Sequence, residues 1–298
     1  MILPNTIPMK NRFLSLVFLI CITAIAKAQI LTAKENSSYF GWLNQYSLTN
    51  FAGDNGCVPT CSVNAMTYLQ NANPLYFGSN LTGTSYLDWY STAEFISGPN
   101  YLNTSASSGT AFTNIQPALE SYITGFRGFT NVQFSQMQST VSGSNYIGLP
   151  TVNFLFNALT AGEAAIFGFI NPNAPAGSIG HELAACGLTW DPFLNTGTIS
   201  FIDPLDPSSN GSTNGPAQVT TGTISYASGE YSGLSYTNAL AISYSQYQGR
   251  LPYTNNYADA FGLIVSANII AVPEPSTNAL LGLGAIGILM VMLRKQMA

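Results

Sequence analysis

Three residue types in this chain could together support nucleophilic catalysis by a thiol. Cys57 and Cys61 stand four residues apart in GCVPTCSVNAM, and His181, the only histidine in the sequence, opens the run HELAACGL. Asp203 and Asp206 follow soon after, in TISFIDPLDP. A thiol nucleophile needs a base, and that base needs a partner that orients it. The chain therefore contains, in order, the three parts that such chemistry requires.

The segment that carries Cys57 is predicted to be a helix that begins at Gly56 or Cys57 and runs to Leu69. Its apolar residues have roughly helical spacing, and Pro59 fits only in a first helical turn. A thiol at a helix N-terminus meets the positive end of the helix dipole, which favours the thiolate. The backbone N–H of the same residue can stabilise an oxyanion. The alternatives for such a cysteine are a disulfide and a small buried side chain.

His181 and Asp203 are expected at the ends of two successive strands. Residues 181–188 and 198–202 are short apolar runs of the kind found in buried strands. Because side chains alternate along a strand, His181 should share a face with Leu183, whereas Cys186 should point to the opposite face. A lone histidine is more often structural than catalytic, but this one opens a core strand shortly before an acid.

The rest of the chain predicts an α+β fold, in which an N-terminal helical part precedes an antiparallel sheet. Helices are also expected at 114–123 and 151–159, and strands at 128–134, at 164–170 and in further segments after residue 220. Three stretches are interpreted as irregular: a lead-in at 29–56, a surface excursion at 74–112 with one short helix near Ser91–Ile96, and a flexible loop at 208–215.

The N-terminus has the pattern of a secretory signal peptide. MKNRFLSLVFLICITAIAKAQ contains a basic start, an apolar stretch and the cleavage pattern Ala26-Lys27-Ala28. The alternative is a membrane anchor, but the apolar stretch is too short for one. We therefore predict that residues 1–28 are a signal peptide and that the protein is exported.

The C-terminus resembles the PEP-CTERM sorting signal. VPEPSTNALLGLGAIGILMVMLRKQMA contains a Pro-Glu-Pro motif, an apolar and glycine-rich stretch, and basic residues after it. The alternative is a plain tail anchor. The resemblance implies that residues 272–298 are recognised by an exosortase-type sorting enzyme, with a transmembrane helix in the membrane before processing. It also implies the envelope or surface of a Gram-negative-type bacterium, with release into the extracellular matrix as a further possibility.

Residues 29–271 are predicted to form the functional domain, and their composition excludes one class of partner. Of the eight basic residues only Lys34, Arg127 and Arg250 lie here, against twelve of the thirteen acids, so the net charge is about −9. A surface of this charge does not suit nucleic acid. The domain also holds three cysteines, an odd number, so at least one thiol has no partner within the chain.

The domain resembles the papain-like cysteine peptidases, particularly the bacteriocin-leader-processing type. The resemblance covers about residues 45–206 and rests on GCVPTCSVNAM, on NALTAGEAAIFGFI, on the Gly-His pair that opens an apolar strand, and on the later Asp-Pro. Ala164 stands where proline is usual in the second of these motifs. The region from His181 to Asp206 is also similar to the immunoglobulin-degrading cysteine endopeptidases. A papain-like fold is implied, with the nucleophile helix packed on an antiparallel sheet.

The resemblance assigns roles to four residues. Cys57 would be the nucleophile, His181 the base that becomes the general acid, and Asp203 the group that orients the imidazole. Gln45 would complete the oxyanion hole, although it lies twelve residues before the cysteine, a longer gap than the common pattern. Asp206 is the second candidate for the orienting acid. The implied function is a thiol-dependent hydrolase, a cysteine peptidase that acts on a peptide or protein substrate without a cofactor.

Several alternatives remain open at the level of sequence. Val58 stands where glycine usually follows the nucleophile, and a β-branched residue adopts a positive φ only at high cost. Cys61 could pair with Cys186, act as a resolving thiol or pack in the core, and a metal site that uses Cys57, Cys61 and His181 would need a fourth ligand. The domain could also transfer acyl groups to an amine, or be a non-catalytic matrix or adhesive surface protein on the same fold.

Overall fold

A computed structural model describes residues 29–49, 55–170, 180–205, 216–244 and 261–272 of the chain. The predicted signal peptide, the loop at 208–215 and the apolar stretch of the sorting signal lie outside these ranges. Asp206 and Arg250 also lie outside them.

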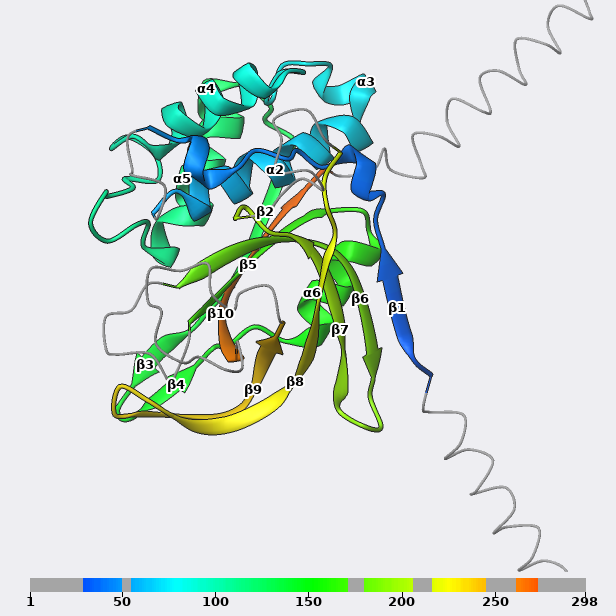
Figure 1. Cartoon of the computed structure of the whole chain (residues 1–298), viewed down its shortest axis with the longest axis vertical. Coiled ribbons are helices and arrows are strands. Elements are labelled where there is room, and N and C mark those ends of the chain that lie inside the picture. The colour runs from blue at the N-terminus through cyan, green and yellow to red at the C-terminus, as the bar shows by residue number, and fades with distance from the viewer. Residues whose placement is uncertain (1–28, 50–54, 171–179, 206–215, 245–260, 273–298) are drawn as a thin grey trace, which may run out of the picture.

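The described residues form a helical layer that covers one side of a strongly curved sheet (Figure 1). The helices are α2 (Cys57–Ala72), α3 (Pro74–Phe77), α4 (Tyr86–Ser97), α5 (Ile115–Glu120) and α6 (Val152–Thr160), with short turns at η1 (Ser37–Tyr39), η2 (Gln45–Ser47), η3 (Phe112–Asn114) and η4 (Ser121–Phe126). The strands are β1 (Leu31–Lys34), β2 (Gln133–Gln138), β3 (Thr140–Ser142), β4 (Asn145–Ile147), β5 (Ala164–Ile170), β6 (His181–Asp191), β7 (Thr196–Ile202), β8 (Thr220–Tyr231), β9 (Leu234–Ser243) and β10 (Phe261–Ala271). The predicted α+β class is confirmed.

The sheet is largely antiparallel and partly closed on itself. Its strand order is β2-β10-β5-β6-β7-β8-β9-β4-β3, and β1 pairs with β6. Strand β10 pairs with β9 as well as with β5, so the strands from β5 to β10 form a ring. The contact between β4 and β9 is parallel, and the other pairings are antiparallel. Closure of this kind leaves fewer exposed strand edges.

Helix α2 is the central element of the helical layer. Every residue from Cys57 to Gln70 is buried, because the helix packs on β5 and β6 on one side and on α4 on another. Pro59 lies in its first turn, as predicted. The buried Asn64 accepts a hydrogen bond from the Leu43 backbone N–H and donates one to its carbonyl, which ties the N-terminal segment to the helix. Helix α6 packs on the opposite face of β5 and β6.

The interpretation of residues 74–112 as a surface excursion is wrong. Leu81, Trp89, Ala93 and Ile96 in this stretch are at most 3% exposed and form part of the core around α2. Helix α4 begins at Tyr86, five residues before the predicted Ser91. A capping box explains the early start, because the side chains of the preceding Ser85 and of Asp88 each bond the other's backbone N–H.

Two smaller predictions also need correction, and two short strands were not predicted at all. The lead-in at 29–56 contains β1, which pairs with the far end of β6 and places Ala33 opposite Leu188. The strand predicted at 128–134 begins only at Gln133, because Arg127 to Gly128 still ends a helical turn and Gly128 has a positive φ. Strands β3 and β4 are too short and too exposed to leave an alternating pattern in the sequence.

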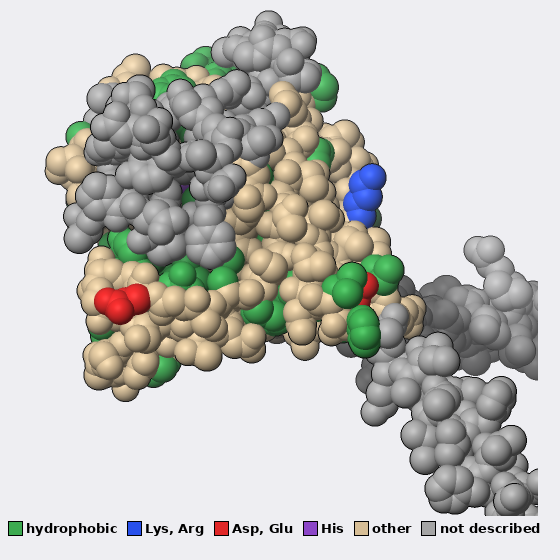
Figure 2. Space-filling view, turned by 60° about the horizontal axis from the view of Figure 1, so that its bottom comes forward, with side chains coloured by type: hydrophobic (Ala, Val, Ile, Leu, Met, Phe, Trp, Pro, Cys, Tyr) green, Lys and Arg blue, Asp and Glu red, His purple; other side chains and the backbone are tan. Residues whose placement is uncertain are grey.

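The surface carries few charged side chains. On the face shown in Figure 2, uncharged polar groups and backbone dominate, and the acidic and basic residues are isolated. This agrees with a charged fraction of 7% over the whole sequence. Within the described ranges, no helix combines the length and the apolar character needed to cross a membrane.

Candidate active site

His181 and Asp203 lie side by side, as their strands predict. His181 is the first residue of β6 and Asp203 directly follows β7, and the antiparallel pairing of these strands brings the two ends together. His181 Nε2 and Asp203 Oδ1 are 2.8 Å apart, and both side chains are 4% exposed. A buried carboxylate at this distance fixes the orientation of the imidazole and favours its protonated form.

The Asp203 carboxylate is itself held from two sides. Its Oδ1 also accepts a hydrogen bond of 2.9 Å from the Leu205 backbone N–H, and Oδ2 accepts one of 3.3 Å from the Tyr244 hydroxyl. Phe169 packs edge to face against both His181 and Tyr244. The carboxylate therefore has little freedom to turn away from the imidazole.

Cys57 is the first residue of α2, and its side chain forms a hydrogen bond with the His181 imidazole. Burial lowers the pKa of His181, but the charge and hydrogen bond of Asp203, followed by the hydrogen bond and charge of Cys57, raise it to about 10. Asp203 bonds to the imidazole at Nε2, and Cys57 is the second side chain that forms a hydrogen bond with the ring. The imidazole thus lies between an acid and a thiol, and the arrangement can hold a thiolate–imidazolium pair.

Val58 does not strain the backbone after Cys57. It is the second residue of α2 and is absent from the non-glycine residues with positive φ, which in the described ranges are Asn103, Asn195, Ser232 and Asn238. A helical conformation is open to a β-branched residue. The concern raised by the missing glycine therefore does not apply, and the Cys57 N–H lies among the free donors of the first helical turn.

Gln45 lies next to the start of α2 despite its distance in sequence. It is the first residue of η2 and is 1% exposed. A Cβ atom placed on Gly56 would come within 3.2 Å of the Gln45 carbonyl oxygen and 3.6 Å of its Cβ, so the glycine leaves room for this close approach. The Gln45 backbone N–H donates to the Pro204 carbonyl at 2.9 Å. The same residue therefore adjoins both the helix start and the segment that carries Asp203.

Glu182 is a site residue that the sequence interpretation missed. It is fully buried, and neither carboxylate oxygen has a hydrogen-bond partner among the described residues. Its Oε2 lies over Gly168 on the neighbouring strand, where a Cβ atom would also collide with the ring of Phe112. Burial, followed by the nearby charge of Cys57, raises the pKa of Glu182 well above its ordinary value. The available signal was a carboxyl group inside an otherwise apolar run.

The other two cysteines of the domain have packing roles. Cys57, Cys61 and Cys186 are all free and buried, so the pairing of Cys61 with Cys186 considered from the sequence is wrong. Burial raises the pKa of Cys61 well above its ordinary value, and it raises that of Cys186 to about 12. These thiols are therefore poorly reactive. No group of three or more His, Cys, Asp or Glu in the described ranges is arranged to hold a metal ion.

The comparison with known families identifies the C-terminal segment. The model of the PEP-CTERM protein-sorting motif matches residues 271–295. No curated protein matches the chain. The motif marks a protein that is exported and sorted to the cell envelope or surface of a Gram-negative bacterium, with an exosortase as the sorting enzyme.

Proposed function

We propose that this exported surface protein is a thiol-dependent hydrolase, most simply a cysteine peptidase, whose domain spans residues 29–271. The observation that carries the proposal is the buried His181, which is held by Asp203 at 2.8 Å on one side and faces Cys57 at the start of α2 on the other. This is the arrangement of nucleophile, base and orienting acid that covalent catalysis requires.

In the proposed reaction, the Cys57 thiolate attacks the carbonyl carbon of a peptide bond. A C–S bond forms while the carbonyl electron pair moves to oxygen, and the backbone N–H of Cys57 and the Gln45 side-chain amide stabilise this oxyanion. The C–N bond then breaks as the His181 imidazolium gives its proton to the leaving amine. Water, deprotonated by His181, next attacks the thioester, and the acid product leaves as the thiolate forms again.

The neighbouring Glu182 is compatible with this chemistry because its burial favours the uncharged form of the carboxyl group. Burial, and then the nearby charge of Cys57, raise its pKa well above the ordinary value, which disfavours a second anion beside the thiolate. In this form it can donate a hydrogen bond rather than repel negative charge. We therefore assign it no step in the reaction but expect it to affect the environment of the thiolate.

Labelling of the thiol tests the proposal. The full chain, without reducing agent, is treated with sub-stoichiometric iodoacetamide from acidic to mildly basic pH, and mass spectrometry locates the adduct. We expect rapid labelling of Cys57 at low pH, and loss of this reactivity in His181→Ala. Cys61→Ser is the matched control, because it removes a thiol one helical turn away and should leave the Cys57 profile unchanged. A positive result justifies a screen for cleaved peptides.

A non-catalytic surface protein on the same fold is the second candidate, and the burial of the site favours it. Cys57 is 5% exposed and His181 4%, so little of either side chain meets solvent. On this interpretation His181 and Asp203 form a structural pair. Slow labelling of Cys57 with ordinary thiol pH dependence, unchanged in His181→Ala, would refute the catalytic proposal and leave this one.

A further inference from the structure

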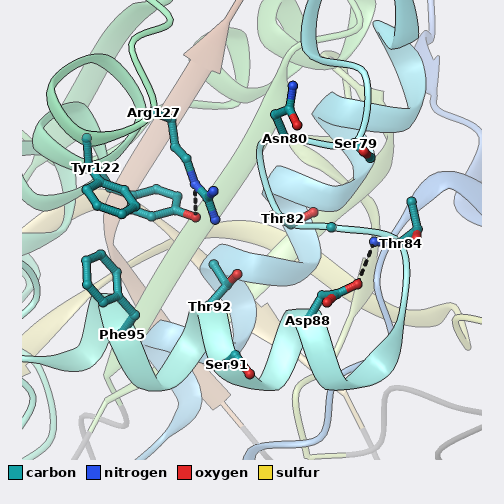
Figure 3. A pocket seen from close by; sticks show the side chains of 12 residues that line it. Ser79, Asn80, Thr82, Thr84, Asp88, Ser91, Thr92, Phe95, Tyr122 and Arg127 are labelled. Atoms are coloured by element: carbon teal, nitrogen blue, oxygen red, sulfur yellow. Dashed lines mark hydrogen bonds between the residues drawn. The ribbon is translucent and has the colours of Figure 1, made fainter.

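A hollow lies in the helical layer, and none of the residues assigned to the candidate active site line it. It has a volume of about 560 Å³ and opens between α4, the turn that precedes it and η4 (Figure 3). Its floor consists of the buried side chains of Thr82, Thr92 and Tyr122. A pocket of this size, lined by a few fixed polar groups and aromatic rings, is typical of a small-ligand site.

Arg127 presents a fixed positive charge to this hollow. Its Nε donates a hydrogen bond of 2.8 Å to the Tyr122 hydroxyl, and its guanidinium lies 5.2 Å and 5.4 Å from the ring centres of Tyr122 and Phe126. The Tyr122 hydroxyl in turn donates to the Leu81 carbonyl at 2.8 Å, which anchors the pair to the core. A guanidinium held in this way has lost much of its freedom before any ligand arrives.

Within the described residues, no ion pair joins this guanidinium to a carboxylate. Asp88 is the acid that lines the same hollow, but its Oδ2 accepts hydrogen bonds from the Thr84 and Ser85 backbone N–H groups and from the Ser85 hydroxyl. Figure 3 shows Asp88 turned toward Thr84, away from Arg127. In a domain with a net charge of about −9, the hollow therefore offers an unneutralised cation to a ligand.

The remaining walls combine hydroxyl groups with exposed rings. Hydroxyl and amide side chains line most of the hollow, namely those of Ser79, Asn80, Thr82, Thr84, Ser91 and Thr92. The rings of Phe95 and Phe126 are 44% and 55% exposed, and their centres lie 4.7 Å apart at one end. Hydroxyl groups both donate and accept hydrogen bonds, as sugar hydroxyls do, while the rings can cover the apolar C–H face of a sugar.

We propose that this hollow binds an acidic oligosaccharide, with one sugar carboxylate on Arg127 and the adjoining neutral sugar along the hydroxyl-lined wall. A polyanion is less suitable than a sparsely charged glycan, because the domain as a whole is acidic. An acidic peptide shares the carboxylate but presents backbone amides where the wall offers mainly hydroxyl groups, so we expect it to bind less tightly. The proposal does not depend on the chemistry of Cys57.

Calorimetric titration of the purified full chain at low ionic strength provides the test. Cellobiouronic acid, with one carboxylate, is compared with neutral cellobiose, with acetate and with an acetylated Gly-Glu-Gly amide. We expect the acidic disaccharide to bind roughly tenfold or more tightly than each of the others, since a charged hydrogen bond and the sugar contacts must act together. Added salt should weaken this binding.

Variants of the chain separate recognition from folding. Arg127→Gln should weaken cellobiouronate binding roughly tenfold, whereas Lys34→Gln, which changes the net charge equally on β1, should not. Ser91→Glu removes no packed side chain and adds a carboxylate to the hollow, so it should also reduce binding. The proposal is overturned if cellobiouronic acid does not bind, or if it binds no more tightly than cellobiose, acetate or the peptide. It is also overturned if the Arg127→Gln variant binds cellobiouronic acid as tightly as the parent chain does.

Discussion

The pairing of His181 with Asp203 leads to a quantitative prediction about Asp203→Asn. The pKa of His181 is raised from an ordinary 6.5 to about 10, with Asp203 as the larger of the two groups that raise it. At about 1.4 kcal/mol per pH unit, this difference corresponds to roughly 5 kcal/mol of stabilisation at low pH. Breaking a buried pair by removing one charge costs about 3 to 5 kcal/mol, which is consistent with that figure.

The sign of the pH dependence follows from the raised pKa. A histidine whose pKa is higher in the folded state stabilises the fold fully below about pH 6.5, and this contribution declines as the pH rises toward 10. Urea unfolding should therefore show that Asp203→Asn destabilises the protein most near pH 6 and progressively less toward pH 10. Glu120→Gln, which removes an exposed acid on α5, should show no such dependence.

The single histidine allows the charge itself to be observed. Its imidazole gives one unambiguous set of NMR signals in a chain purified without a histidine tag. In the parent protein these signals should titrate near pH 10, and in Asp203→Asn the midpoint should fall because the largest charge that raises it is lost. A midpoint near 6.5 in both proteins would refute the reasoning, since the imidazole would then not sense the carboxylate.

Two further predictions concern the neighbours of the pair. Glu182→Gln should stabilise the protein increasingly above pH 4.5, by up to about 1.4 kcal/mol per pH unit, because burial raises the pKa of this carboxyl in the folded state while the unfolded chain ionises normally. Urea unfolding at pH 4.5 and pH 7.5 measures this effect. A difference in unfolding free energy between the two proteins that is the same at both pH values would contradict it. Gln45→Ala should reduce the rate of peptide cleavage roughly a hundredfold if the side chain stabilises the oxyanion, while leaving the iodoacetamide profile of Cys57 unchanged. Equal cleavage rates in the variant and the parent protein would show that the Gln45 side chain does not stabilise the oxyanion.

The sequence predicted the elements that carry chemistry better than the elements that cover them. The start of α2, strand β5 and the beginning of β6 were recognised because Pro59 and continuous apolar runs are strong local signals. The short helix expected near Ser91–Ile96 lies within α4, but the burial of residues 74–112 was missed because their polar and glycine-rich composition hides core residues such as Trp89. Ring closure of the sheet through β9 and β10 is a long-range pairing that no local pattern encodes.

The candidate site shows the same division between local and long-range information. Cysteine, histidine and aspartate could be proposed together from residue type and order alone. The contribution of Tyr244 could not, because it reaches Asp203 from the end of β9, 41 residues later in the chain. Glu182 was visible as an acid in an apolar run, but whether it was exposed at a strand end or buried over Gly168 depended on the register between β5 and β6.

One turn after β7 connects the two halves of the candidate site. Within it, Asp203 accepts the Leu205 N–H, the Pro204 carbonyl accepts the Gln45 N–H, and the Leu205 carbonyl accepts an amide N–H of Asn44. Asp203, which orients His181, and Gln45, which is proposed for the oxyanion hole, are therefore both held by hydrogen bonds to this one turn. A change in this turn should disturb both residues, whereas a change at Tyr244 should disturb mainly the acid, because the Tyr244 hydroxyl donates to Asp203 Oδ2.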